Sequence, residues 1–289
     1  MNLRDYFEKA QKENFAIGAF NIDTLETLKA VCEAAKVKKS PVIVEFSPGE
    51  VKYFGLDNIV DLVNNAKEDY KLPIFLNLDH GKSEEACIGA LNAGNFDLVH
   101  FDGSELDFGE NLKIAKKIAE EAHKKGVLVE GEINKISGSS TVSEEELNME
   151  FLKESYTKVQ KAAEFVQETK IDIFAPVIGN LHGVFPVQTD LDIVLLMNLH
   201  QLLGSTFLSL HGGSGIPALQ VQEAIKIGGI VKVNVNTELR ETFRDALEEE
   251  LAEKPQEYSY YNISPEVVLN IQETVENKID VFGSAGKAV

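Results

Sequence analysis

The sequence predicts a single (β/α)8 barrel, a TIM barrel, that spans residues 1–289. Eight short apolar runs, rich in β-branched or aromatic residues, alternate with amphipathic segments along the chain. The runs are almost continuously apolar, as strands are when helices cover both faces of a parallel sheet. No linker or internal repeat divides the chain, and 289 residues fit one barrel of about 250 residues with insertions.

The predicted strands share this apolar character and occupy residues 16–20, 41–46, 73–78, 97–101, 127–132, 171–178, 206–210 and 230–235. Helix signals lie between them. Residues 23–26 (Asp-Thr-Leu-Glu) predict a capping box at the start of the first helix, and Ser83 predicts the cap of another. Residues 108–125 carry the apolar spacing of a third helix. The pair Ser264-Pro265 predicts that the last helix covers 265–280.

A doubly wound open sheet is the alternative fold for this alternation. It predicts a glycine-rich dinucleotide-binding turn after the first strand, and residues 19–24 (AFNIDT) contain no glycine. The connection after the fifth strand is about 20 residues long, and connections of that length in compact domains often act as lids. Glu144, Glu145 and Glu146 lie in it, either as functional groups or as the solvated start of a helix.

The charge of the chain restricts its partners. With 28 Lys and Arg against 47 Asp and Glu the formal net charge is −19, which argues against nucleic acid or an anionic membrane surface as a partner. No apolar run reaches the roughly 18–20 residues of a membrane span, and the N-terminal segment lacks an apolar signal-peptide core. The two cysteines, Cys32 and Cys87, lie in helix-like stretches. We expect reduced thiols in a cytoplasmic protein.

Polar residues follow every predicted strand. In a barrel of this kind the carboxyl ends of the strands form one rim, where active sites lie. The residues expected at that rim are Asn21, Ser47, Asp79, His80, Asp102, Ser104, Glu130, Glu132, Asn180, His182, His211, Ser214, Asn234 and Thr237.

Three of the six histidines stand at predicted strand ends and precede a glycine: His80, His182 and His211. A single histidine at a strand end is more often a hydrogen-bonded structural residue. Three imidazoles that converge with carboxylates beside them are the ligand set of a catalytic divalent metal, usually zinc. Glu132 and Asp102 could supply a fourth ligand or orient the histidines. The remaining histidines lie inside a predicted strand or on helices: His100, His123 and His200.

The glycine-rich turn at 212–215 has the composition of an anion site. Consecutive glycines allow backbone N–H groups to close on an anion, and Ser214 adds a hydroxyl donor. Thr237 is predicted to cap the helix after the eighth strand, whose N-terminus attracts phosphate. Two tight turns without a ligand are the alternative interpretation of the same residues.

Seven segments together resemble the signature stretches of the class II, metal-dependent ketose-bisphosphate aldolases, which include the fructose- and tagatose-bisphosphate aldolases. These are GAFN (18–21), LDHG (78–81), FDGS (101–104), VEGE (129–132), GNLHG (179–183), LHGGSGIP (210–217) and VNVNTELR (233–240). The resemblance runs from about residue 3 to the end. It implies a barrel, a Zn²⁺ ion or another divalent ion such as Co²⁺, Fe²⁺ or Mn²⁺, and a homodimer or homotetramer.

The resemblance also implies roles for single residues. His80, His182 and His211 would bind the metal, with Glu132 a ligand at a second, buried position and Asp102 nearby. Asp79 would be the acid/base. The residues implied in substrate binding are Asn21, Ser47, Asn180, Gly183, Gly212, Ser214, Asn234 and Thr237. The carbonyls of Gly183 and Gly212 would coordinate a monovalent cation, Na⁺ or K⁺.

The implied reaction cleaves or forms a ketose (bis)phosphate such as fructose 1,6-bisphosphate through an enediolate of dihydroxyacetone phosphate. A divalent cation stabilises that charge, and a carboxylate moves one proton. The other known route uses a Schiff-base lysine on a strand. The predicted sixth strand has no lysine, and Lys232 lies early in the eighth strand, away from the rim.

Three departures from the family pattern bear on the function. Ser140 stands where the family has a glutamate that deprotonates dihydroxyacetone phosphate, so either a glutamate at 144–146 reaches in from the lid or this step is altered. The lysine that usually follows the histidine-glycine pair at 182–183 is missing, and EYSYYNISP (257–265) replaces an Asp-Pro-Arg stretch. The alternatives are therefore a relative with altered chemistry, a metal-dependent hydrolase, or a non-catalytic homologue that binds metal and sugar phosphate.

Overall fold

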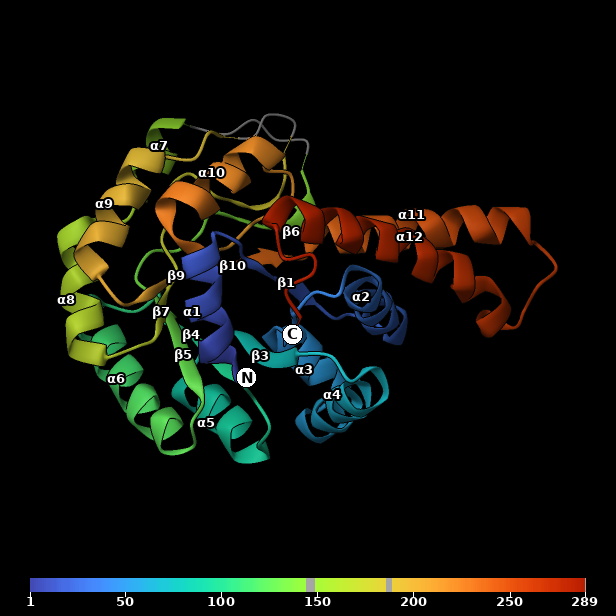
Figure 1. The fold of residues 1–289 in the computed structure, drawn as a ribbon, viewed down its shortest axis with the longest axis horizontal. Helices are drawn as coiled ribbons and strands as arrows, with labels where there is room; N and C mark the ends of the chain where they lie inside the picture. Colours follow the sequence, from blue (N-terminus) through green and yellow to red (C-terminus); the bar gives the residue numbers. More distant parts are fainter. Residues whose placement is uncertain (144–148, 186–188, 289) are drawn as a thin grey trace.

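The computed structural model describes residues 1–143, 149–185 and 189–288 and confirms the predicted barrel (Figure 1). Eight parallel strands close in the order β1-β10-β9-β7-β5-β4-β3-β2. The barrel strands are β1 (Ile17–Asn21), β2 (Val42–Phe46), β3 (Ile74–Gly81), β4 (Leu98–Asp102), β5 (Leu128–Glu132), β7 (Ile173–Phe174), β9 (Phe207–Leu210) and β10 (Ile230–Val235). Their inward and outward faces are both buried, which explains the nearly continuous apolar runs.

Helices surround the barrel, and most of them pack on it through one large apolar core. They are α1 (Leu3–Glu13), α2 (Leu25–Lys38), α3 (Pro48–Phe54), α4 (Leu56–Tyr70), α5 (Glu84–Ala93), α6 (Phe108–Lys124), α7 (Met149–Glu154), α8 (Val159–Thr169), α9 (Ile193–Leu203), α10 (Ala218–Gly228), α11 (Thr237–Glu253) and α12 (Tyr260–Phe282). No helix in the described part of the chain has the length and apolar character to cross a bilayer.

Helix α1 closes the amino-terminal end of the barrel. Its residues Leu3, Tyr6, Phe7 and Ala10 are buried and form a second apolar cluster with the first inward-facing residues of the strands. The Tyr6 ring packs edge-on against Phe75, with 5.5 Å between ring centroids. This end is therefore filled by apolar side chains, and the opposite end is left for polar groups.

Three predicted boundaries are wrong. The strand expected at 73–78 extends to Gly81, so Asp79 and His80 lie within it. The strand expected at 171–178 covers only Ile173–Phe174, because the chain leaves the barrel to form the turn that carries Asn180. The last helix begins at Tyr260, not at 265. Asn262 N–H already donates to Ser259 O, so the first turn forms ahead of Ser264 and Pro265 lies inside the helix.

Two predicted caps are shifted by one residue. Thr24, not Asp23, caps α2, since its side chain accepts from the Thr27 N–H at 3.2 Å. Asn236, not Thr237, is the cap residue of α11. The cap predicted from Ser83 is confirmed, since its side chain accepts from Ala86 N–H, and the helix predicted at 108–125 is α6, which begins at Phe108.

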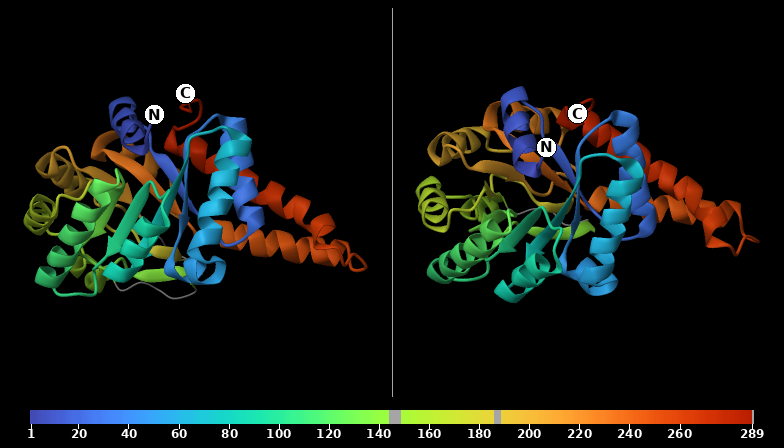
Figure 2. Two further views of the ribbon diagram at one scale, coloured as in Figure 1. Left: turned by 90° about the horizontal axis from the view of Figure 1, so that it is seen from below. Right: turned by 60° about the horizontal axis from the view of Figure 1, so that its bottom comes forward.

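Helices α11 and α12 form a long hairpin that projects from one side of the barrel (Figures 1 and 2). Its far end carries the exposed side chains of Leu251, Tyr258 and Tyr261. The chain returns along α12 so that the C-terminus lies close to the N-terminus. Gly286 N–H donates to Lys38 O there, which ties the tail to the end of α2.

The segment after the fifth barrel strand crosses the mouth of the barrel. Its strand β6 (Gly138–Val142) pairs in parallel with β8 (His182–Val184), and Gly138 is the partner of His182. A Cβ at position 138 would lie 2.1 Å from the His182 carbonyl oxygen, and one at Gly183 would lie 2.4 Å from that of Ser139. The close approach of the two backbones therefore requires both glycines.

Candidate active site and metal centre

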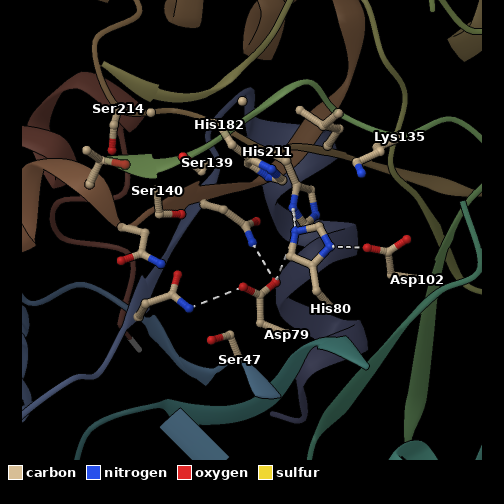
Figure 3. A pocket seen from close by; sticks show the side chains of 18 of the residues that line it. Ser47, Asp79, His80, Asp102, Lys135, Ser139, Ser140, His182, His211 and Ser214 are labelled. Atoms are coloured by element: carbon tan, nitrogen blue, oxygen red, sulfur yellow. Dashed lines mark hydrogen bonds and ion pairs between the residues drawn. The ribbon is translucent and has the colours of Figure 1, made fainter. Parts of the chain in front are cut away.

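A cavity of about 300 Å³ opens at the carboxyl ends of the strands (Figure 3). It is the rim that the sequence predicts. The predicted residues that line it are Asn21, Ser47, Asp79, His80, Asp102, Ser104, Glu132, His182, Gly183, His211, Gly212, Ser214, Asn234 and Thr237. Two of the residues expected at the rim do not line it. Asn180 is buried behind the wall and donates to the His211 carbonyl oxygen at 3.1 Å, and Glu130 is buried one layer below.

The three predicted histidines meet at the centre of this cavity. Nε2 of His80 lies 3.1 Å from Nδ1 of His211. The His182 ring stands on the lid side of these two, with its centroid 5.0 Å from that of His80 and 6.2 Å from that of His211. The three predicted residues therefore share the cavity, although the compact groups of possible ligand atoms found among the described residues contain His80 and His211 and not His182.

A fourth histidine belongs to the same cluster. His100 lies inside β4 and its side chain points into the barrel, with its ring centroid 4.6 Å from that of His80 and 4.9 Å from that of His211. Nitrogen atoms of these three rings and a carboxylate oxygen of Asp79 all lie within 4.8 Å of one another. His80, Asp102 and Glu132 form a second group of the same compactness.

The donor set fits a divalent metal ion. Nε2 of His100 and Oε2 of Glu132 are buried and have no hydrogen-bond partner, although burial of an unpaired polar atom is unfavourable. Burial also raises the pKa of Glu132 to about 7, against the opposing effect of His80. Mixed imidazole and carboxylate ligands suit Zn²⁺ and other first-row ions. A cation in this cluster would satisfy the unpaired atoms.

Asp102 orients His80 from behind. Its Oδ2 lies 2.9 Å from Nδ1 of His80, and its Oδ1 accepts from the Ser104 hydroxyl at 2.6 Å. Lys82 Nζ also contacts this carboxylate. Burial alone would lower the pKa of His80, but Asp79, Asp102 and Glu132 hold it well above its usual value. The pocket therefore attracts positive charge at the position of this ring.

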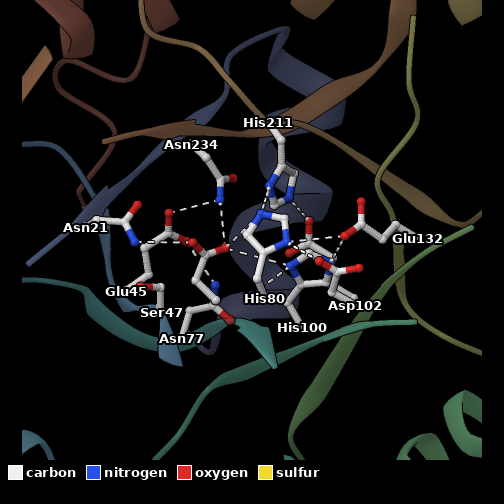
Figure 4. A network of polar contacts seen from close by, with 12 residues as sticks. Asn21, Glu45, Ser47, Asn77, His80, His100, Asp102, Glu132, His211 and Asn234 are labelled. Atoms are coloured by element: carbon white, nitrogen blue, oxygen red, sulfur yellow. Dashed lines mark hydrogen bonds and ion pairs between the residues drawn. The ribbon is translucent and has the colours of Figure 1, made fainter. Parts of the chain in front are cut away.

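Asp79 lies beside His80 in the cavity (Figure 3), and Asn21, Asn234, His80 and His211 belong to one polar network (Figure 4). Asn21 and Asn234 each donate to one of its oxygens through Nδ2 at 3.2 Å. Burial alone would raise the pKa of Asp79, but the charges of His80, His211 and Lys232 and a contact with His100 hold it well below its usual value. Two amides thus fix an ionised carboxylate beside the histidines.

A buried ionic layer lies directly below. Glu130 accepts from Nε2 of His211 at 2.8 Å and from Lys232 Nζ at 2.8 Å. Burial alone would lower the pKa of Lys232, but Glu130 and Glu45 raise it above its usual value. A protonated, fully buried lysine is no nucleophile, so this geometry opposes the Schiff-base alternative.

The glycine turn forms one end of the cavity. Gly212 and Ser214 face the cavity, whereas Gly213 N–H donates to the Asn234 carbonyl and Gly215 N–H donates to Glu238 Oε1 at 2.6 Å. The Oδ1 atom of Asn236, at the start of α11, is buried and unpartnered beside them. This end therefore offers a ligand the Gly212 backbone, the side chains of Ser214 and Asn236, and the N-terminus of α11.

The lid is the connection between β5 and α7. Its described part, residues 133–143, forms the roof of the cavity. Ser139 and Ser140 on β6 line the cavity, and Lys135 lies on the opposite side of the histidines from Ser214 (Figure 3). Lys135 is paired with Glu105 at 2.6 Å. The predicted lid glutamates Glu144, Glu145 and Glu146 lie outside the described residues.

Three comparisons place these features among known proteins. Residues 1–287 match the family described as fructose-bisphosphate aldolase class-II. A fructose-bisphosphate aldolase of Geobacillus stearothermophilus is 36% identical over 291 residues, which cover 100% of this chain and 98% of that protein. A 6-phospho-5-dehydro-2-deoxy-D-gluconate aldolase of Shouchella clausii is 36% identical over 96% of this chain and 93% of its own length. The crystal structure of the YdjI aldolase of Escherichia coli K12 superposes with a TM-score of 0.84 at 30% identity, covering 100% of this chain and 99% of that chain.

Proposed function

The chain belongs to the class II fructose-bisphosphate aldolase family over its whole length, and from this we propose that it is a metal-dependent aldolase that cleaves or forms a ketose phosphate such as fructose 1,6-bisphosphate. One observation carries the proposal. The Asp79 carboxylate is fixed by two amides beside a cluster of histidines, in a cavity whose far end is a glycine turn. A metal-dependent aldol cleavage of a sugar phosphate needs a metal site, an acid/base and a phosphate site in one cavity.

His80, His182 and His211 would hold the metal, and Asp102 and Glu130 would fix two of the rings by their far nitrogens. A divalent ion bound there would polarise the ketose carbonyl and stabilise the enediolate that forms when the C3–C4 bond breaks. The unpaired Glu132 Oε2 and His100 Nε2 support a cation in this cluster.

Asp79 would carry the proton on the aldehyde side of the cleaved bond. Asn21 and Asn234 donate to both of its oxygens, so the carboxylate keeps one orientation while it accepts or returns a proton. The closed floor of apolar side chains below the ionic layer excludes bulk water from that face. Gly212, Ser214 and Thr237 would hold the phosphate of dihydroxyacetone phosphate at the opposite end.

A relative with altered proton chemistry is the second candidate, and Ser140 favours it. This residue lines the cavity from the lid where the family pattern has a carboxylate. A serine hydroxyl with its ordinary pKa does not remove a proton from carbon at neutral pH. The related aldolase from Shouchella clausii acts on a different sugar phosphate, which supports substrate variation within this fold.

The test is a substrate panel. Zinc-loaded protein is incubated with fructose 1,6-bisphosphate, tagatose 1,6-bisphosphate and 6-phospho-5-dehydro-2-deoxy-D-gluconate, and release of the cleaved products is followed. We expect cleavage of at least one ketose phosphate that stops when a chelator removes the metal. Metal-loaded protein that cleaves none of them, and exchanges no hydrogen between dihydroxyacetone phosphate and solvent, would contradict the proposal.

A further inference from the structure

Lys232 is a fully buried cation that the proposed reaction leaves without a role. It lies in β10, and its Nζ is 2.8 Å from Glu130 Oε2 and 3.4 Å from Glu45 Oε2. All three side chains have no exposed surface. Moving charged groups out of water costs several kcal/mol per ion, so such a cluster persists only with close pairing.

One arm of this cluster reaches a predicted metal ligand. Glu130 accepts from Lys232 through Oε2 and from Nε2 of His211 through Oε1, both at 2.8 Å. The Ser209 hydroxyl donates to the same Oε1 at 2.5 Å. With Nε2 engaged below, the His211 ring turns Nδ1 towards His80 and the cavity. Lys232 thus fixes the carboxylate that sets the direction of this ligand.

The other arm reaches the acid/base. Glu45 accepts from Asn234 Nδ2 at 2.9 Å through Oε1 and from Asn77 Nδ2 at 2.9 Å through Oε2. Asn234 donates through that same Nδ2 to Asp79 at 3.2 Å. The position of the amide between the two carboxylates therefore depends on where Glu45 lies.

The strand register explains why one lysine serves both arms. Lys232 lies next to Ile17 on one neighbouring strand and Ser209 on the other. Asn234 is two residues further along β10, so its side chain points into the barrel one layer higher. A long side chain that starts low in the barrel can reach carboxylates on β2 and β5.

We propose that Lys232 is a positioning residue that holds the metal side and the acid/base side of the site in one arrangement. Its ammonium group secures Glu130 below His211 and Glu45 below Asn234. This inference rests on the proposed function, because it assigns Lys232 to the same site. It does not require Lys232 to touch substrate or metal.

The test replaces Lys232 by a neutral side chain of similar length, Lys232→Met. Zinc affinity is measured by competition with a chromogenic chelator, and the visible spectrum of the Co²⁺-loaded protein reports the ligand geometry. We expect zinc affinity to fall by about 10–100-fold, as for other groups that orient metal ligands, together with a changed Co²⁺ spectrum and a lower kcat. Lys67→Met is the matched control. Lys67 pairs with Asp97 at 2.9 Å, ahead of β4 at the far end of the barrel, and its loss should change none of these three properties.

Two isosteric variants test the contact through Glu130 and the contact through Glu45 separately. They also keep the inference testable if Lys232→Met fails to fold. Glu130→Gln should weaken zinc binding and change the Co²⁺ spectrum. Glu45→Gln should lower kcat while zinc affinity stays within about threefold, since this arm ends at the acid/base. The metal measurements need no substrate. A wild-type protein that binds zinc but cleaves no ketose phosphate therefore refutes the proposed function, while the zinc affinity and Co²⁺ spectrum of the variants still test the role of Lys232.

Two results would overturn the inference. One is a folded Lys232→Met protein with the zinc affinity, Co²⁺ spectrum and kcat of the wild type. The other is a Glu130→Gln variant with unchanged zinc binding together with a Glu45→Gln variant with unchanged kcat. The first result includes a Lys232→Met protein that only loses stability, with normal metal binding and kcat in the molecules that remain folded, because this would show a purely structural lysine.

Discussion

Nδ1 of His80 lies 2.9 Å from Oδ2 of Asp102, so the opposite nitrogen of the ring is directed at His211. A carboxylate on the far nitrogen is the usual support of a histidine that binds metal, because it fixes both the tautomer and the orientation of the ring. Glu130 does the same for His211. Two of the three predicted ligands are therefore held in a binding orientation by carboxylates of other strands.

Metal binding is the first prediction. The purified protein should retain about one divalent ion per chain, and replacement of His80, His182 and His211 together by alanine should abolish that retention, because a site with three protein ligands loses its chelation. Metal content is measured by elemental analysis after gel filtration. His123→Ala is the control, since His123 pairs with Asp172 away from the site. Stoichiometric metal in the triple variant would reject this ligand set.

The second prediction concerns Asp79. Asp79→Asn keeps the shape of the side chain and removes its charge, so kcat should fall by about 10²–10⁴-fold, the usual span for a general acid/base. Steady-state kinetics on the best substrate of the panel measure the change, and elemental analysis checks that the metal content stays normal. A variant with wild-type kcat would assign the proton transfer to another group.

The third prediction concerns the lid. If a glutamate of the lid replaces the missing base, changing Glu144, Glu145 and Glu146 together to glutamine should stop solvent hydrogen exchange into dihydroxyacetone phosphate while metal binding stays normal. Proton NMR in deuterated water follows that exchange. Exchange that survives in the triple variant would place the base outside this loop.

The cavity residue Ser140 allows the complementary experiment. If the wild type shows no exchange, Ser140→Glu should create it, because this position lines the cavity and a carboxylate there would face the same ligand. Ser143→Glu is a matched control, since Ser143 lies on the same segment and does not line the cavity. Equal gains in both variants would show that a nearby negative charge, rather than a base at position 140, changes the rate.

The fourth prediction concerns the two thiols. Cys32 and Cys87 are buried, and burial raises the pKa of each to about 12 from an ordinary value of 9.0. Neither should react with a thiol reagent at pH 8 in the native protein, and both should react in urea. Because the unfolded chain ionises first, the stability that this burial provides is present below pH 9 and falls as the pH rises towards 12. Rapid native labelling of either thiol would contradict the packing of α2 or α5.

Most of the barrel and its rim could be predicted because the signal is local and repeated. Each apolar run ends in a polar residue, and parallel strands bring those ends together. The lengths of the elements could not be predicted equally well. Continuous apolarity at 171–178 does not show where the chain leaves the sheet, and Pro265 marks a helix start only when no earlier turn has formed.

The place of His100 in the cluster and the pairing of the ionic layer could not be predicted for a different reason. His100, Glu45 and Lys232 lie inside apolar runs, so the search at strand ends passes over them. A signal was available: an ionisable residue inside an otherwise apolar strand must find a buried partner. Pairing these residues requires the closed barrel, because β2 and β10 are not neighbours in it and their side chains meet only through its interior.

Gly138 and Gly183 lie where the lid pairs with the strand of His182, and they limit which lid positions can be substituted to change the substrate. Gly138 and Gly183 both have positive φ, 96° and 106°, and a side chain on either would meet a carbonyl oxygen of the other strand. A library for new substrates should therefore leave both positions unchanged. Diversity belongs at Lys135, Ser139 and Ser140, which face the cavity from the same segment and can vary without separating the two backbones.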